Sequence, residues 1–207
     1  MTLKDNWKID QGKTAFVTID LQPTWLEPGS PRELAQARTM VPKINELADI
    51  CRRLQIPIIH VRTAVRSDLS DIGLLQEFRP RTDSELEYLE GRRGAEFYKV
   101  LDVRKGDYTV IKIRYSAFIP GSSSLEPLLR GLGKDSLIVC GLATDVCVGT
   151  TVRDAMMLGF RVFLVSDLTA TFNEERQRVE LEVLGQHFAK VVTSEQVKVE
   201  LKQLATK

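Results

Sequence analysis

The sequence predicts an α/β protein of one domain: a doubly wound sheet of about six mainly parallel strands with helices on both faces. Three observations predict this class. Short β-rich runs alternate with longer segments whose apolar residues recur at helical spacing. The runs are continuously apolar, as expected of strands covered on both faces. The 207 residues contain no repeat and no Pro/Gly/Ser-rich linker, so we expect one domain over residues 1–207 with its core at about 14–193.

The first half of the chain contains three expected strands. The first covers residues 14–19 (TAFVTI) and ends at Asp20. Residues 31–54 predict a helix with one apolar stripe, and Pro42 opens or kinks its main part. The second strand is expected at 56–61 and the third at 108–113. Between them, the charge-rich stretch 68–101 predicts a loop with one or two short helices.

The second half continues the alternation. A short helix at 125–132 precedes a fourth strand at 136–140. Thr144 and Asp145 can cap a helix that runs to about residue 158, where Gly159 suits a C-terminal stop. A fifth strand at 161–165, a helix at 173–188, a sixth strand from 191 and a terminal helix complete the pattern. In such sheets ligands bind at the carboxyl ends of the strands, so residues that follow strands are the candidates for function.

Composition excludes several classes of protein. Lys plus Arg number 29 and Asp plus Glu 28, a formal net charge of +1, which argues against nucleic-acid and membrane-surface partners. The N-terminus has no apolar signal segment and no run is long enough to span a membrane, so we expect a cytoplasmic protein. Three cysteines do not make a disulfide framework, and two histidines exclude a metal site that needs three.

Three residues after or near strand ends could carry chemistry. A carboxylate at Asp20 is costly to bury unless it is paired; the alternative is a loop or helix cap. Lys112 lies in an apolar run and needs a partner, unless it points to water from an edge strand. Cys147 lies in the first turn of an expected helix, where the helix dipole lowers a thiol pKa and favours a thiolate nucleophile. The alternative is a buried small hydrophobe, which we expect for Cys51 and Cys140.

Together these residues form a coherent set, because a nucleophilic thiol needs a base and a nearby lysine can stabilise its thiolate. His60 could also serve as a base, but a single histidine at a strand end is more typical of a structural hydrogen bond. From the residues alone, a cysteine hydrolase and a protein without this chemistry both remain open.

Three segments resemble the motif blocks of the isochorismatase-like cysteine hydrolases. They are residues 18–22 (TIDLQ), 112–118 (KIRYSAF) and 141–148 (GLATDVCV), of which the third is the most specific. Their order and spacing match the family from about residue 15 to 192. The resemblance implies an isochorismatase-like, Rossmann-like fold, a homo-oligomer (dimer or tetramer), and neither cofactor nor metal.

The resemblance also implies a role for each matching residue. Cys147 would attack the carbonyl carbon of an amide or ureide. Asp20 would take the thiol proton and deliver it to the leaving amine, and Lys112 would hold both groups electrostatically. In the family the peptide bond before Ala143 is cis, which would direct the N–H groups of Ala143 and Cys147 at the oxyanion. Trp25 matches an aromatic wall of the family pocket.

Further candidates for substrate binding are Gln22, Arg62, Tyr115, Phe118 and Phe172. The two phenylalanines would be walls, with core packing as the alternative. Arg62, or else Arg66, could bind a substrate carbonyl or carboxylate bidentately, unless these arginines are solvated or bridge subunits. Gln22 and Tyr115 could orient those contacts.

The motifs also favour one branch of the family. Residues 60–68 lack the Asp-x-His metal cluster of its nicotinamidases, whereas Cys147, which the true isochorismatases lack, is present. We therefore expect C–N hydrolysis of a small amide, carbamoyl or ureido compound, closest to the biuret and ureidoacrylate hydrolases. The alternatives are a non-catalytic binding or moonlighting member, or a nicotinamidase-type amidase. A flavodoxin-like or thiol redox protein is disfavoured, since no Gly-x-Gly-x-x-Gly or Cys-x-x-Cys motif is present.

Overall fold

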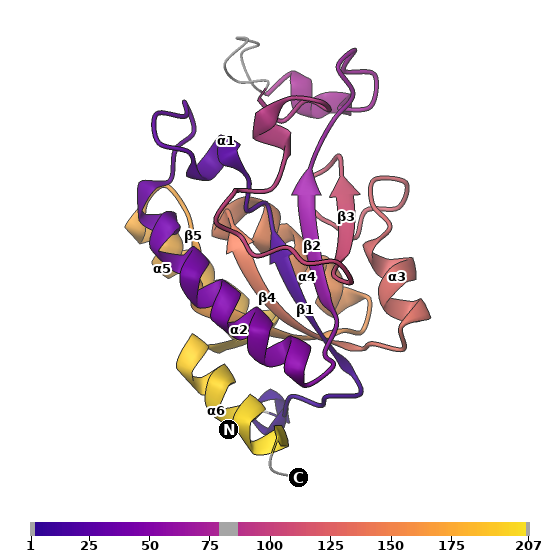
Figure 1. The fold of residues 1–207 in the computed structure, drawn as a ribbon, viewed down its shortest axis with the longest axis vertical. Helices are drawn as coiled ribbons and strands as arrows, with labels where there is room; N and C mark the ends of the chain where they lie inside the picture. The colour runs from indigo at the N-terminus through magenta and orange to yellow at the C-terminus, as the bar shows by residue number, and fades with distance from the viewer. Residues whose placement is uncertain (1–2, 79–86, 206–207) are drawn as a thin grey trace.

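The computed structural model describes residues 3–78 and 87–205. Six parallel strands form one sheet in the order β3-β2-β1-β4-β5-β6 (Figure 1). The predicted fold class is confirmed. The strands are β1 (Thr14–Ile19), β2 (Ile58–Thr63), β3 (Tyr108–Lys112), β4 (Ser136–Leu142), β5 (Arg161–Ala170) and β6 (Lys190–Val192).

Helices cover both faces of the sheet. The α-helices are α1 (Pro23–Leu26), α2 (Val41–Arg53), α3 (Leu125–Gly131), α4 (Gly149–Met157), α5 (Glu174–His187) and α6 (Ser194–Ala205). Buried side chains of α2 and α6 join one apolar cluster, and those of α3, α4 and α5 join the other. In Figure 1, α2 and α6 lie in front of the sheet and α3 lies beside it. Each face of the sheet is therefore buried, which explains the continuously apolar strands.

Strand β1 shows how the two cores share one strand. All six of its residues are buried. Phe16 packs in the cluster with α2 and α6, while Ala15 and Val17 pack in the cluster with α3, α4 and α5. Since side chains along a strand alternate between faces, both sets of side chains in a doubly covered strand are buried, which explains why apolar residues predominate in β1.

Several boundaries differ from the prediction. The helix expected from residue 31 begins at Val41, after a 3-10 turn at Ala35–Met40, with Pro42 in its first turn. The helix expected after β4 starts as a π-helical turn, η6 (Thr144–Val148), which has no side-chain cap. The predicted cap is absent because Thr144 is buried and Asp145 accepts a hydrogen bond from Thr171 Oγ1 at 2.5 Å instead.

The segment between β2 and β3 covers the carboxyl ends of these strands (Figure 1). Its described part contains the 3-10 helices Gly73–Gln76 and Arg93–Ala95, in agreement with the predicted short helices; residues 79–86 lie outside the described range. Val65, Ile72 and Leu89 form a small apolar cluster of their own here. None of the helices in the described part of the chain is long and apolar enough to cross a membrane.

Candidate active site

Three strand ends at the carboxyl edge of the sheet bring the predicted catalytic residues together. Asp20 follows β1, Lys112 is the last residue of β3, and Cys147 lies in η6 after β4. Lys112 Nζ is 2.9 Å from Asp20 Oδ2 and 3.3 Å from Cys147 Sγ. The three side chains are between 0 and 7 % exposed. Residues 127 positions apart in the sequence thus form one buried cluster.

The backbone around this cluster requires particular residues. Asp20 has a φ of +52°, a left-handed conformation that Asp tolerates better than most residues, and its N–H donates to Val61 O at 2.9 Å. Gly141 has a φ of +124°, and a Cβ there would lie 2.1 Å from the Ile19 carbonyl oxygen. Only glycine therefore lets the end of β4 approach the end of β1 this closely. The Leu142–Ala143 peptide bond that follows is cis.

Lys112 is fully buried although β3 is an edge strand. Besides Asp20, its ammonium group donates to Thr63 Oγ1 at 2.7 Å and to Arg114 O at 3.1 Å. Burial lowers the pKa of Lys112, but the negative charge of Asp20 and the contacts with Asp20 and Cys147 outweigh burial and raise this pKa above its ordinary value. The lysine is therefore a permanent cation at neutral pH and does not point to water.

The resting Cys147 side chain is a thiol. Burial raises the pKa of Cys147 to about 12, and the attraction of Lys112 only partly offsets this. The expectation of a thiol pKa lowered by the helix dipole is therefore wrong for the resting site. The physical reason is first that burial removes the water that would solvate a thiolate, and second that a thiolate would add a negative charge beside the carboxylate of Asp20. A base must remove the proton before this sulfur can attack. Cys51 and Cys140 are buried, as predicted.

A cavity of about 310 Å³ opens onto Cys147. Four other predicted residues line it: Trp25, Tyr115, Ala143 and Phe172. The Trp25 and Phe172 rings meet edge to face with their centroids 6.3 Å apart. The rest of the lining is Arg32, Thr63, Val65, Ile72, Leu75, Tyr88, Ile113, Arg114 and Val146. The walls are thus mostly aromatic and aliphatic, with two guanidinium groups.

Gln22 holds the backbone and is not among the cavity residues. Its side chain is fully buried, and its Nε2 donates to the carbonyl oxygens of Thr63 at 2.8 Å and Ala95 at 3.0 Å. Its Oε1 accepts from the Thr63 N–H at 2.8 Å. These bonds occupy both ends of the amide, so the predicted role of orienting substrate does not fit; Gln22 fastens β2 to the segment that covers it.

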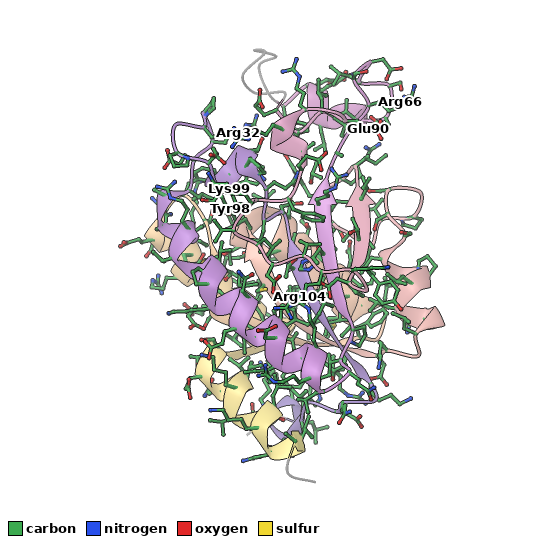
Figure 2. All side chains as sticks on the ribbon, in the orientation of Figure 1. Arg32, Arg66, Glu90, Tyr98, Lys99 and Arg104 are labelled. Atoms are coloured by element: carbon green, nitrogen blue, oxygen red, sulfur yellow. The ribbon has the colours of Figure 1, made fainter. Side chains whose placement is uncertain are left out.

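Arg62 and Phe118 also lie outside the cavity lining. The Arg62 guanidinium donates to Ala95 O and lies over the Phe97 ring, because both belong to the segment packed against β2. Phe118 packs on Phe160 in the core, the alternative stated for it. Arg66 is 60 % exposed and pairs with Asp68. Figure 2 shows Arg66 beyond the end of β2, whereas Arg32 lies beside α1.

His60 has a structural role. Its Nδ1 is 2.8 Å from Thr18 Oγ1 and its Nε2 is 3.3 Å from Asp107 Oδ2. Burial lowers the pKa of His60. Because both ring nitrogens are engaged inside the protein, the histidine is a structural hydrogen-bonding residue and not the base of this site. Among residues 3–78 and 87–205, no three His, Cys, Asp or Glu side chains lie together as a metal site would need.

Sequence reasoning missed several cavity residues. Thr63 is the last residue of β2, so its position at a strand end was a signal that could have found it. Arg32 follows α1, and the apolar wall of Ile72, Leu75 and Tyr88 comes from the segment after β2. Loops carry no periodicity that would show which of their side chains turn toward a site.

A buried Asp–Lys–Cys cluster beside a small cavity, at the carboxyl edge of a parallel sheet, is a site built for chemistry on a small molecule. Comparison with known proteins identifies the group in which it occurs. The family model described as Isochorismatase domain matches residues 14–196. The protein belongs to the isochorismatase family of hydrolases.

Three relatives are similar over most of this chain. An uncharacterised isochorismatase family protein, YwoC of Bacillus subtilis (strain 168), is 30 % identical over 91 % of this chain and 94 % of its own. Nicotinamidase 3 of Arabidopsis thaliana is 32 % identical over 79 % and 80 %. The ureidoacrylate amidohydrolase RutB of Azorhizobium caulinodans is 27 % identical over 76 % of each chain.

The fold also matches a solved structure. The cysteine hydrolase from Pseudomonas syringae pv. phaseolicola 1448A superposes with a TM-score of 0.89, is 27 % identical in sequence, and covers 96 % of each chain.

Proposed function

We propose that the protein is a cysteine-dependent amidohydrolase that cleaves a C–N bond of a small amide, carbamoyl or ureido compound through a thioester. The observation that carries this proposal is the Lys112 ammonium group, which is 2.9 Å from Asp20 Oδ2 and 3.3 Å from Cys147 Sγ. The thiol lies on the wall of a cavity of about 310 Å³, a size suited to a small molecule.

The first step is attack on the carbonyl carbon. Asp20 takes the proton from the Cys147 thiol as the sulfur forms its bond to carbon, and the carbonyl oxygen gains the negative charge. The proton moves from one anion-forming group to the other, so the net charge of the buried cluster does not change. This makes the step possible although the pKa of Cys147 is raised to about 12.

The next steps expel the amine and regenerate the thiol. Asp20 gives its proton to the leaving nitrogen, the C–N bond breaks, and a thioester remains on Cys147. Asp20 then takes a proton from water, whose oxygen attacks the thioester carbon, and the proton returns to the sulfur as the C–S bond breaks. We assign stabilisation of both oxyanions to the backbone N–H groups of Ala143 and Cys147, donors of a kind typically worth about 10²–10³ in rate.

The relatives and the cavity support this class of substrate. Two of the relatives are named as a nicotinamidase and a ureidoacrylate amidohydrolase. Arg32 and Arg114 both line the cavity, but Arg114 Nη1 donates to the carbonyl oxygens of Asp71 and Ile113. We therefore assign to Arg32, whose guanidinium lies over the Trp25 ring, the carbonyl or carboxylate contact expected of Arg62. We also propose, from the family resemblance alone, that the protein is cytoplasmic and forms a homo-oligomer. Sedimentation velocity tests the oligomeric state.

Ammonia release from a panel of compounds tests the proposal. The panel holds biuret, ureidoacrylate, N-carbamoyl amino acids, nicotinamide and simple amides, each with and without a chelator. We expect a chelator-insensitive hit that Cys147→Ala abolishes and that Cys51→Ala, the same change at a buried cysteine in α2, leaves intact. Activity retained in Cys147→Ala would refute the mechanism. A silent panel together with an unreactive Cys147 would favour a non-catalytic binding member of the family.

A further inference from the structure

The hydroxyl of Thr63 joins the two charged groups of the catalytic cluster. Thr63 Oγ1 donates to Asp20 Oδ1 at 3.0 Å and accepts from Lys112 Nζ at 2.7 Å. Thr63 itself is the last residue of β2 and lines the cavity. A single hydroxyl group therefore donates a hydrogen bond to the carboxylate and accepts one from the ammonium group.

The Lys112 ammonium group has more acceptors than protons. Four acceptor atoms lie within 3.3 Å of Nζ: Asp20 Oδ2, Thr63 Oγ1, Arg114 O and Cys147 Sγ. An ammonium group has three N–H donors. Its hydrogen bonds run to Thr63 Oγ1, Arg114 O and Cys147 Sγ, so Asp20 Oδ2 faces the ammonium group as an ion-pair partner and accepts no hydrogen bond.

We propose that Thr63 is a positioning residue, which selects the oxygen of Asp20 that receives the thiol proton. This inference rests on the proposed cysteine hydrolase mechanism. Because the Thr63 hydroxyl occupies Oδ1, the thiol proton goes to Oδ2. Oδ2 accepts no hydrogen bond, so it is free to take that proton, and Lys112 Nζ already donates at 3.3 Å to the sulfur that becomes charged.

The placement of Thr63 is itself built into the fold. The Gln22 side-chain amide pairs with the Thr63 peptide group in both directions, through N–H···O contacts of 2.8 Å each. Gln22 is fully buried and also donates to Gly94 O and Ala95 O. The strand end that carries Thr63 is thereby held between the chain after β1 and the segment that covers the site.

Few titratable groups share this position. Asp20 from the end of β1, Lys112 from β3 and Cys147 from η6 are the titratable side chains whose charges interact with one another here, and Arg114 contributes its carbonyl oxygen to Lys112. Loss of the Thr63 hydroxyl leaves Oδ1 of Asp20 without its hydrogen bond, so the carboxylate is no longer held in the orientation that presents Oδ2 to the thiol.

The extent to which Cys147 is alkylated tests the role of Thr63, and this assay does not require the substrate to be known. Native protein is treated with iodoacetamide between about pH 5 and pH 9, and the Cys147 peptide is quantified by mass spectrometry. In Thr63→Val we expect labelling at neutral pH to fall about tenfold, since hydrogen bonds to charged groups are the stronger ones and the carboxylate loses the one that orients it. Thr63→Ser, which keeps the hydroxyl, should stay within about twofold of the native protein.

Matched controls separate this effect from a fold defect. Thr14→Val makes the same change at a buried threonine at the start of β1, and should leave the profile unchanged. Thr63→Ala, which removes the hydroxyl with less crowding, replaces the valine variant if circular dichroism shows a disturbed fold. A reactive Cys147 whose profile ignores the loss of the Thr63 hydroxyl would overturn this inference alone. A Cys147 that is inert in the native protein would overturn the proposed function, and the role of Thr63 with it.

Discussion

Replacement of Lys112 by methionine should destabilise the folded protein by about 3–5 kcal/mol at pH 7, because it leaves a buried carboxylate without its cation. Nζ and the Asp20 Oδ2 atom are 2.9 Å apart, and both side chains are at most 1 % exposed. At an effective dielectric constant of about 20, their attraction is about 6 kcal/mol. Part of that lost attraction is offset, because folding of the variant no longer transfers an ammonium group from water into the protein interior. Methionine matches the lysine stem in shape, so packing contributes little.

A double-mutant cycle in urea measures this coupling. Unfolding of the native protein, Lys112→Met, Asp20→Asn and the double variant is followed by circular dichroism and tryptophan fluorescence. The double variant should be clearly more stable than Lys112→Met, because its buried partner carries no charge.

The measured destabilisation of Lys112→Met distinguishes a buried ion pair from an exposed one. A destabilisation of Lys112→Met below about 1 kcal/mol would mean that the pair behaves as an exposed salt bridge. A double variant no more stable than Lys112→Met would equally contradict a buried charge on Asp20.

Three further predictions concern the site and its walls. Gly141→Ala should unfold the protein or lower its melting temperature severely, because the new Cβ would meet a β1 carbonyl oxygen at 2.1 Å; Gly133→Ala, also at positive φ but with open space, should cost only about 1 kcal/mol in thermal unfolding. Asp20→Asn should lower kcat on any substrate found by the panel at least about 100-fold, because an amide cannot take the Cys147 proton and return it to the leaving nitrogen; a kcat close to the native value would contradict Asp20 as the base. Phe172→Ala should raise KM about tenfold with little change in kcat or melting temperature, because this ring is half exposed at the cavity; an unchanged KM would remove it from the binding wall.

The order of strands and helices was predictable because it depends on local patterns. Strand β1 has the predicted bounds of residues 14–19, and the other strands differ only at their ends. The predicted element boundaries that proved wrong are those set by contacts between residues far apart in the sequence. Asp145 accepts from Thr171, 26 residues away, instead of capping its own helix, and no local rule anticipates such a partner.

The candidate site was predictable to the extent that it follows strand ends. Asp20 and Lys112 were identified as costly charges in apolar surroundings, and the structure places each beside the other. Gln22 and Arg62 also follow or end strands, but their side chains turn to the covering segment. Sequence position thus selects residues near a site and does not reveal which way their side chains point.

The sequence by itself determined the fold class, the edge of the sheet at which ligands bind, and three residue types able to do nucleophilic chemistry. The apolar periodicity and the motif blocks are local properties of the chain. Only the tertiary structure decided the protonation of Cys147, the bridge at Thr63 and the apolar wall of the cavity. Each depends on burial or on distances between residues far apart in the sequence, and the energy of a buried charge changes steeply with both.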